Sequence, residues 1–166
     1  MNLAIKFLII FISCSFISCN IKQKKLEKIH ELDQESRSSK NLKEWNKNAE
    51  ILIKELKNYA KTYPGDSIAP SMLFKASEIE LLMGDTNTAL NTIQDIIINM
   101  PYIYEIPKVL FREAYIYDLK DDRAIALKKY QKIIEEYPDD IVAFKAKEAI
   151  KEINFSIHVL DTDTTR

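Results

Sequence analysis

Asn-Met-Pro-Tyr at residues 99–102 lies midway between two similar stretches, Tyr-Pro-Gly-Asp at 63–66 and Tyr-Pro-Asp-Asp at 137–140. The prolines of the three stretches are therefore spaced 37 residues apart. Proline cannot donate to the hydrogen-bond ladder of a helix, so each stretch is expected to end a helix. An equal period in this range indicates stacked structural repeats.

The segments between these breakers also repeat. Leu-Phe-Lys-Ala at 73–76, Leu-Phe-Arg-Glu at 110–113 and Ala-Phe-Lys-Ala at 143–146 are variants of one phrase. Gly-Asp-Thr-Asn-Thr-Ala-Leu at 84–90 and Asp-Asp-Arg-Ala-Ile-Ala-Leu at 121–127 are variants of another. The chain has only two glycines and five prolines, and its composition favours helices. We therefore expect an all-α fold.

These repeats resemble the tetratricopeptide repeat (TPR), whose units hold two antiparallel helices in about 34 residues. That family places small residues at positions 8 and 20, where paired helices approach closely, and proline at position 32, where the second helix ends. Units that start at Pro70 and Pro107 put at these positions Ser77, Ala89 and Pro101, then Ala114, Ala126 and Pro138. Two departures are Glu80, where an aromatic residue is common, and Asp121, which replaces the glycine of the turn.

The resemblance implies a short TPR-type α-solenoid over residues 41–155. Full repeats are expected at about 70–103 and 107–140, with half-repeats at 42–63 and 141–154 on either side. The first half-repeat has a clear apolar stripe at steps of three or four, formed by Leu42, Trp45, Ala49, Leu52, Leu56, Tyr59 and Tyr63. Residues 156–166 have no apolar period, and we expect them to be a disordered tail.

Residues 1–18 have the pattern of a signal peptide. An apolar run follows Lys6 and is too short to span a bilayer, which needs about 20 apolar residues. The run ends in Phe-Ile-Ser-Cys, which resembles the bacterial lipobox and predicts lipidation of Cys19. Cys14 ends a second such stretch but leaves a shorter apolar core. The alternatives are an ordinary signal peptide and a buried helix with incidental cysteines.

Residues 19–40 are expected to form a lipidated tether. This segment is polar and carries lysines at 22, 24, 25 and 28, which could touch anionic headgroups beside the anchor. Leu26, Ile29 and Leu32 lie at helical spacing and could form one weak amphipathic set. A solvated tether is the favoured interpretation. Several acyl chains on one cysteine would anchor the protein stably, facing the periplasm or the cell exterior of a bacterial envelope.

Several kinds of chemistry are disfavoured by composition. The 24 basic and 25 acidic residues are balanced, which argues against nucleic acid as a partner. Two glycines cannot build a phosphate-binding loop. His30 and His158 stand outside any cluster of metal ligands. The aspartate pairs at 121–122 and 139–140 are interpreted as helix caps. We therefore expect no enzyme activity, no cofactor and no metal.

The resemblance also implies a concave groove, lined by positions 2, 5, 9 and 12 of the first helix in each repeat. Those positions hold Ser71, Phe74, Glu78, Leu81, Lys108, Phe111, Tyr115 and Asp118, with Phe144 from the last half-repeat. The three phenylalanines would form a ladder suited to a short apolar or amphipathic segment. The alternative is that aromatic residues at position 5 serve packing alone.

These features together predict a lipid-anchored protein–protein interaction adaptor of the bacterial cell envelope, with a protein or peptide partner. The chain resembles small repeat lipoproteins and periplasmic repeat proteins of outer-membrane assembly and of the Tol-Pal system. The alternative is a homo-oligomerising structural spacer at the membrane surface, in which the unpaired helix 42–63 covers another copy.

Overall fold

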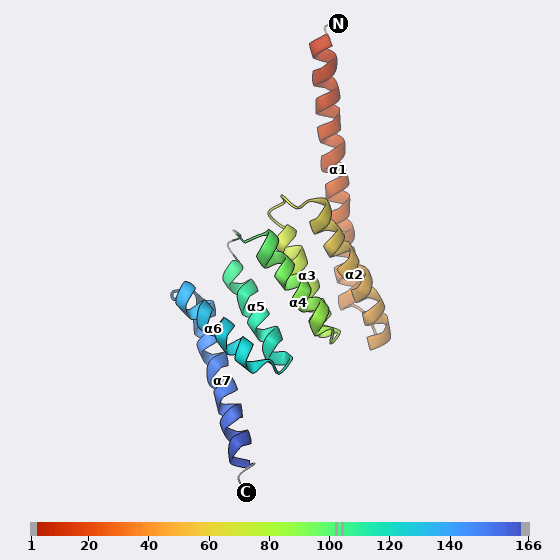
Figure 1. The fold of residues 1–166 in the computed structure, drawn as a ribbon. Coiled ribbons are helices and arrows are strands. Elements are labelled where there is room, and N and C mark those ends of the chain that lie inside the picture. Colours follow the sequence, from red (N-terminus) through yellow and green to blue (C-terminus); the bar gives the residue numbers. More distant parts are fainter. Residues whose placement is uncertain (1–2, 102, 104, 164–166) are drawn as a thin grey trace. The chain divides into compact units, whose positions relative to one another are not determined.

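The computed structural model describes residues 3–101, 103 and 105–163, and it describes the side chains of residues 20–101, 103 and 105–155. Within this part of the chain all regular structure is helical (Figure 1). The helices are α1 (Leu3–Arg37), α2 (Leu42–Thr62), α3 (Ala69–Leu82), α4 (Thr86–Asn99), α5 (Ile106–Leu119), α6 (Arg123–Glu136) and α7 (Ile141–Asp163). The expectation of an all-α fold is confirmed. The chain divides into two compact units between Tyr63 and Pro64.

The first unit is the antiparallel pair α1–α2. Asn41 caps α2, because its Oδ1 accepts a hydrogen bond from the Glu44 backbone N–H at 2.9 Å. The middle of the predicted apolar stripe, Ala49 to Tyr59, is buried, whereas Leu42 at its start is exposed. Burial of this stripe against α1 is the main source of stability that the unit has.

The prediction of a solvated tether at residues 19–40 is wrong for the residues whose side chains are described. Residues 20–37 are helical and pack on α2, with Ile29 buried and Leu26 and Leu32 half-buried. The apolar set at helical spacing is thus the cover that the stripe of α2 needs. Helix 42–63 is therefore paired, and the prediction that it is an isolated half-repeat is also wrong.

The predicted signal peptide and the lipidation sites Cys14 and Cys19 lie outside the described side chains. In the part of the chain that the structure describes, none of the helices combines the length and the apolar character needed to cross a membrane.

The second unit stacks α3 to α7, with each helix packed on the next in sequence (Figure 1). The four small residues that the TPR pattern places between paired helices, Ser77, Ala89, Ala114 and Ala126, are each 0% exposed. Ser77 donates its hydroxyl to the carbonyl of Phe74 at 2.6 Å, so its burial leaves no unmet donor. The expected close approach of the helices in each pair is confirmed.

The two turns inside the repeats have equivalent backbones. Gly84 has φ +81° and Asp121 has φ 60°, so the aspartate occupies the left-handed conformation of the glycine it replaces. The following residue precedes the next helix in both turns, and Asp85 accepts from the Thr88 N–H at 3.0 Å. Asp121 itself is therefore not a cap, contrary to the prediction; Asp122 holds that position without a side-chain cap bond.

Helix α7 covers the last repeat. Val142, Ala146 and Ile153 join the core of α5 and α6, and Asp140 accepts from the Val142 N–H at 2.8 Å at the start of the helix. The helix continues to Asp163, beyond the expected end at 154. Residues 156–163 are thus helical and not a disordered tail, because no glycine or proline interrupts the chain after Pro138. Residues 164–166 of that predicted tail lie outside the described residues.

Candidate functional site

Three phenylalanines occupy equivalent positions on α3, α5 and α7, as the repeat pattern predicts. Phe74 and Phe111 are half-buried, whereas Phe144 on the terminal helix is 60% exposed. The three rings therefore differ in environment, and each must be considered with its own neighbours.

An open cavity of about 310 Å³ lies between α5 and α7. Four predicted groove residues line it: Phe111, Tyr115, Asp118 and Phe144. The structure adds six lining residues that the sequence analysis did not select, namely Arg112, Tyr130, Lys145, Glu148, Ala149 and Glu152. The volume is at the lower end of the range for ligand pockets, about 300–1,000 Å³.

The inner wall of this cavity is aromatic. The rings of Phe111 and Tyr130 have centroids 5.2 Å apart and an interplanar angle of 54°, a favourable tilted arrangement. Tyr130 comes from α6 and is fully buried as a residue. Burial raises the pKa of the Tyr130 hydroxyl, and the charge of Asp118 raises it further, so this wall stays uncharged at neutral pH. Tyr130 lies on the second helix of its repeat and at none of the four groove positions, so the groove pattern did not select it.

The rim of the cavity is charged. Asp118, Glu148 and Glu152 supply three carboxylates, and Arg112 and Lys145 supply two cations. These residues come from α5 and α7. The cavity thus combines an aromatic interior with a mixed rim that carries a small excess of negative charge.

Arg112 also ties this cavity to the preceding repeat. Its Nε lies 2.6 Å from Glu78 Oε1, and its Nη2 donates to Glu78 Oε2 at 2.9 Å. The guanidinium carbon lies 5.3 Å from the ring centroid of Tyr115 and 5.9 Å from that of Phe74. Lys108 Nζ lies 4.4 Å from the same Phe74 ring. Glu78, Phe74 and Lys108 are therefore engaged between repeats, and they do not line the cavity.

The two remaining predicted residues, Ser71 and Leu81, lie on α3 away from the cavity lining. Ser71 donates its hydroxyl to the Ile68 carbonyl at 2.7 Å, and Leu81 is half-buried. The predicted groove residues thus fall into two sets of contacts. One is an ionic and aromatic contact between α3 and α5, and the other is the cavity between α5 and α7.

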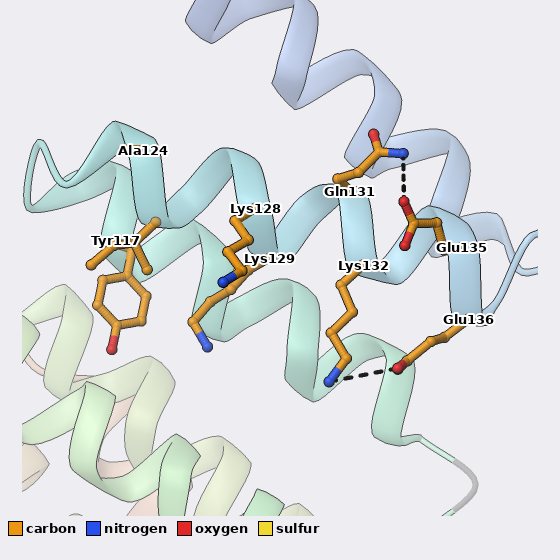
Figure 2. Close-up of a pocket in the computed structure, with 9 residues that line it drawn as sticks. Tyr117, Ala124, Lys128, Lys129, Gln131, Lys132, Glu135 and Glu136 are labelled. Carbon is orange, nitrogen blue, oxygen red and sulfur yellow. Dashed lines mark hydrogen bonds and ion pairs between the residues drawn. The ribbon is translucent and has the colours of Figure 1, made fainter.

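A second, larger hollow of about 940 Å³ lies over α6 and includes Tyr117 of α5 (Figure 2). Most of its charged lining residues have a polar partner. Figure 2 shows the ion pair of Lys132 with Glu136 and the hydrogen bond that Glu135 accepts from Gln131. Lys129 Nζ lies 2.8 Å from Glu113 Oε2 and 5.3 Å from the ring centroid of Tyr117. This surface therefore has the character of a solvated charged face.

Polar contacts next to this hollow join three helices. Gln94 of α4 lies 3.4 Å from both Glu113 Oε1 and the Tyr117 hydroxyl of α5, while Lys129 of α6 binds Glu113. Glu113 is only 7% exposed, and these contacts are what permits its charge to be buried there. Within the described residues, no group of three or more His, Cys, Asp or Glu side chains is arranged to hold a metal ion.

Comparison with known proteins agrees with this fold. Residues 108–140 match the tetratricopeptide repeat family, which is nearly the whole of the second predicted repeat. The structure is similar to that of a thermophilic TPR protein from Thermus thermophilus, with a TM-score of 0.55 and 16% sequence identity. That likeness covers 69% of this chain and 56% of the other chain, little more than half its length. The sequence gives no significant match among curated proteins.

The fold is therefore a short TPR-type α-solenoid, as the repeat pattern predicted. Such folds act as protein–protein interaction modules.

Proposed function

We propose that this chain is a lipid-anchored adaptor of the bacterial cell envelope, and that it binds a short apolar or amphipathic segment of a protein partner in the cavity between α5 and α7. The observation that carries the proposal is the exposure of Phe144, which stands 60% open to solvent beside Phe111 and Tyr115 at the cavity. Covering such a side chain contributes about 1.5–3 kcal/mol when burial is complete. Hot spots of this kind dominate the binding energy of interfaces.

The size and charge of the cavity define the ligand. A volume of about 310 Å³ accommodates one large apolar side chain, with the rest of the segment lying along the rim. The rim holds three carboxylates and two cations, so a segment with a basic residue near its apolar anchor is favoured over an acidic one. No catalytic role is proposed, since the features that support the proposal are those of a binding surface.

Exposed phenylalanines on one helix offer a matched pair for the test. Phe144 lines the cavity, whereas Phe155 is 70% exposed on the same helix outside it. We expect Phe144→Ala to weaken the binding of selected apolar peptides at least tenfold, because the apolar side chain of the peptide then loses most of its contact area in the cavity. Phe155→Ala should leave binding unchanged. The measurement is peptide affinity by fluorescence anisotropy, together with crosslinked partner recovery from native envelopes. Equal affinity of the two variants would rule out this cavity as the site.

The proposed anchor is supported by the lipobox-like ending at Cys19. Its test is metabolic labelling with a fatty-acid probe. Label should be lost in Cys19→Ala and kept in Cys14→Ala, which removes the neighbouring candidate and leaves the apolar run intact. Label that is lost only in Cys14→Ala would move the anchor to that residue.

A homo-oligomerising spacer is the second candidate. Helix 42–63, which first suggested this candidate, is paired with α1 and so does not need another copy to cover it. An exposed apolar surface remains on α7, formed by Ile141, Phe144 and Phe155. Sedimentation equilibrium over a wide concentration range separates the two candidates. A monomer at every concentration would exclude the spacer, whereas a dimer that Phe155→Ala dissociates would favour it.

A further inference from the structure

Lysines are concentrated in one part of the α1–α2 pair, which consists of residues 20–28 of α1 and residues 54–62 of α2. Residues 20–28 and 54–62 together contain seven lysines and two glutamates. The rest of the pair, residues 29–53, contains five acidic and four basic residues and is nearly neutral. Positive charge is therefore concentrated in one part of the pair. We refer to the lysine-rich part as the basic end, and its lysines are Lys22, Lys24, Lys25, Lys28, Lys54, Lys57 and Lys61.

The two halves of the basic end lie side by side. Lys28 Nζ is 2.7 Å from Glu55 Oε1, and Lys25 Nζ donates to Thr62 Oγ1 at 3.2 Å. These two contacts set the antiparallel register, so residues 25–28 of α1 run beside the end of α2. Lys25 also lies 5.7 Å from the ring centroid of Tyr63. Charges that are far apart in the sequence thus form one surface.

Four of the seven lysines of the basic end are exposed, and the other three, Lys22, Lys25 and Lys57, are half-buried. On α2, residues 54, 57 and 61 recur at helical spacing and share one face, away from the buried Leu56 and Tyr59. Lys24, Lys54 and Lys61 are exposed, and the Lys28 side chain is 56% exposed. The hydrogen bond from Lys28, and the charges of Lys28, Lys25 and Lys54, lower the pKa of Glu55 although burial opposes this. The positive charges of the basic end therefore act on the Glu55 carboxylate that lies among them.

We propose that the basic end docks on the anionic headgroups of a membrane surface. The inference rests on the proposed anchor, because Cys19 immediately precedes the basic end. At 1.5 Å per residue, Lys22 to Lys28 lie about 5–14 Å along the helix from residue 19. That distance is comparable to the Debye length of about 8–10 Å, within which anionic lipids attract basic side chains. Each lysine near such a surface strengthens attachment about fivefold.

Docking of this kind adds a second contribution to membrane attachment, beside that of the lipid, and it orients the α1–α2 pair. A lipid on one residue holds the chain at the membrane but leaves the pair free to tumble. Contact through a surface formed by two helices restricts that tumbling, with the basic end toward the headgroups and residues 29–53 away from them.

The test uses the full chain, isolated from membranes and reconstituted into vesicles of phosphatidylcholine alone or of phosphatidylcholine mixed with phosphatidylglycerol. Exposed amines are acetylated with a reagent that does not cross membranes, and each lysine is quantified by mass spectrometry. On anionic vesicles, labelling of Lys24, Lys54 and Lys61 should fall about threefold or more relative to neutral vesicles. Raising the salt to about 1 M should restore it, because the Debye length shrinks to about 3 Å.

Lys40, Lys43 and Lys47 serve as internal controls, since they are exposed and lie toward the other end of the same helix pair. Their labelling should be the same on both vesicles. In a matched pair of variants, Lys24→Glu/Lys54→Glu/Lys61→Glu should abolish the lipid-dependent protection of Lys28, while Lys40→Glu/Lys43→Glu/Lys47→Glu should retain it. Circular dichroism checks that both variants are helical.

Equal labelling of the basic end on neutral and anionic vesicles would overturn the inference, as would equal protection of the control lysines. Failure of the anchor looks different. A chain without a lipid does not float with the neutral vesicles, whatever the lysines do. Loss of peptide binding in Phe144→Ala is likewise independent of the vesicle composition.

Discussion

Arg112 of α5 holds Glu78 of α3 through a hydrogen bond from Nη2 to Oε2 at 2.9 Å and an ion-pair contact between Nε and Oε1 at 2.6 Å. Both side chains are partly covered, with 25% and 36% of their surface exposed. The planar guanidinium reaches both carboxylate oxygens at once, which a lysine cannot do. This pair therefore couples the first helices of successive repeats at the edge of the proposed cavity.

Removing this pair should weaken the second unit modestly. We expect Arg112→Ala to lower the free energy of unfolding by about 1 kcal/mol, and Arg112→Lys to recover less than half of the loss. A double-mutant cycle with Glu78→Gln, measured by urea unfolding, isolates the pairwise coupling. Lys151→Ala, which breaks an exposed pair within α7, is the control and should change stability by less than about 0.5 kcal/mol. Additive losses at residues 78 and 112 would contradict the coupling.

Small residues between paired helices should resist enlargement. Ala114 is fully buried among α5, α6 and α7, so Ala114→Leu should destabilise the chain by about 1–3 kcal/mol through overpacking. Ala124 lies exposed at the start of α6, and Ala124→Leu should change stability by less than about 0.5 kcal/mol. Thermal unfolding of the two variants provides the comparison. A tolerated leucine at residue 114 would mean that the helices are less closely packed than described.

The two left-handed turn residues should respond in opposite directions. Gly84→Ala places a side chain at φ +81° and should cost about 1 kcal/mol. Asp121→Gly relieves the same strain, and should stabilise the chain by up to about 1 kcal/mol, less any contribution from the Asp121–Arg123 ion pair. Gly65, whose φ is not in that region, is the control, and Gly65→Ala should be nearly neutral. Denaturant midpoints measure all three.

The hydroxyl of Tyr130 should ionise only at high pH. Its pKa in the folded chain is raised above the ordinary value of about 10, so the neutral side chain contributes stability below pH 10 that is lost as the pH rises further. Ultraviolet absorbance should show tyrosine ionisation well above pH 10, and Tyr130→Phe should reduce the amplitude of this late step. Loss of amplitude near pH 10 instead would contradict the raised pKa of Tyr130.

Glu55 should show the reverse pH dependence. Its folded pKa is lowered, chiefly by the hydrogen bond from Lys28, so its contribution is present above the unfolded value of 4.5 and lost as the pH falls through the folded pKa. Because the Lys28 side chain of this pair is 56% exposed and is screened by water, we expect less than about 1 kcal/mol. Glu55→Gln should flatten the acid limb of the stability profile, as measured by urea unfolding at a series of pH values. An unchanged acid limb in this variant would contradict the lowered pKa of Glu55.

The candidate site was predictable only in part. Phe111, Tyr115, Asp118 and Phe144 follow from their repeat positions, because equivalent positions on stacked helices meet on the same face. Arg112 was missed because it lies at none of the four groove positions, and its role depends on a carboxylate 34 residues away. Phe74 was placed on the correct helix, yet Lys108 covers its ring, and such a contact across repeats has no local signature in the sequence.

What the sequence determined by itself is the local structure of the repeats. Proline at a 37-residue period ends a helix through the backbone nearby, and small residues recur at fixed positions of each repeat, so their effects can be read from position alone. Only the tertiary structure decided that residues 20–37 cover α2, since a short and weak apolar set becomes a helix face when a second helix buries it. The same holds for the basic end and for the exposure of Phe144. Both depend on which surfaces neighbouring helices cover, and burial is a property of the packed chain.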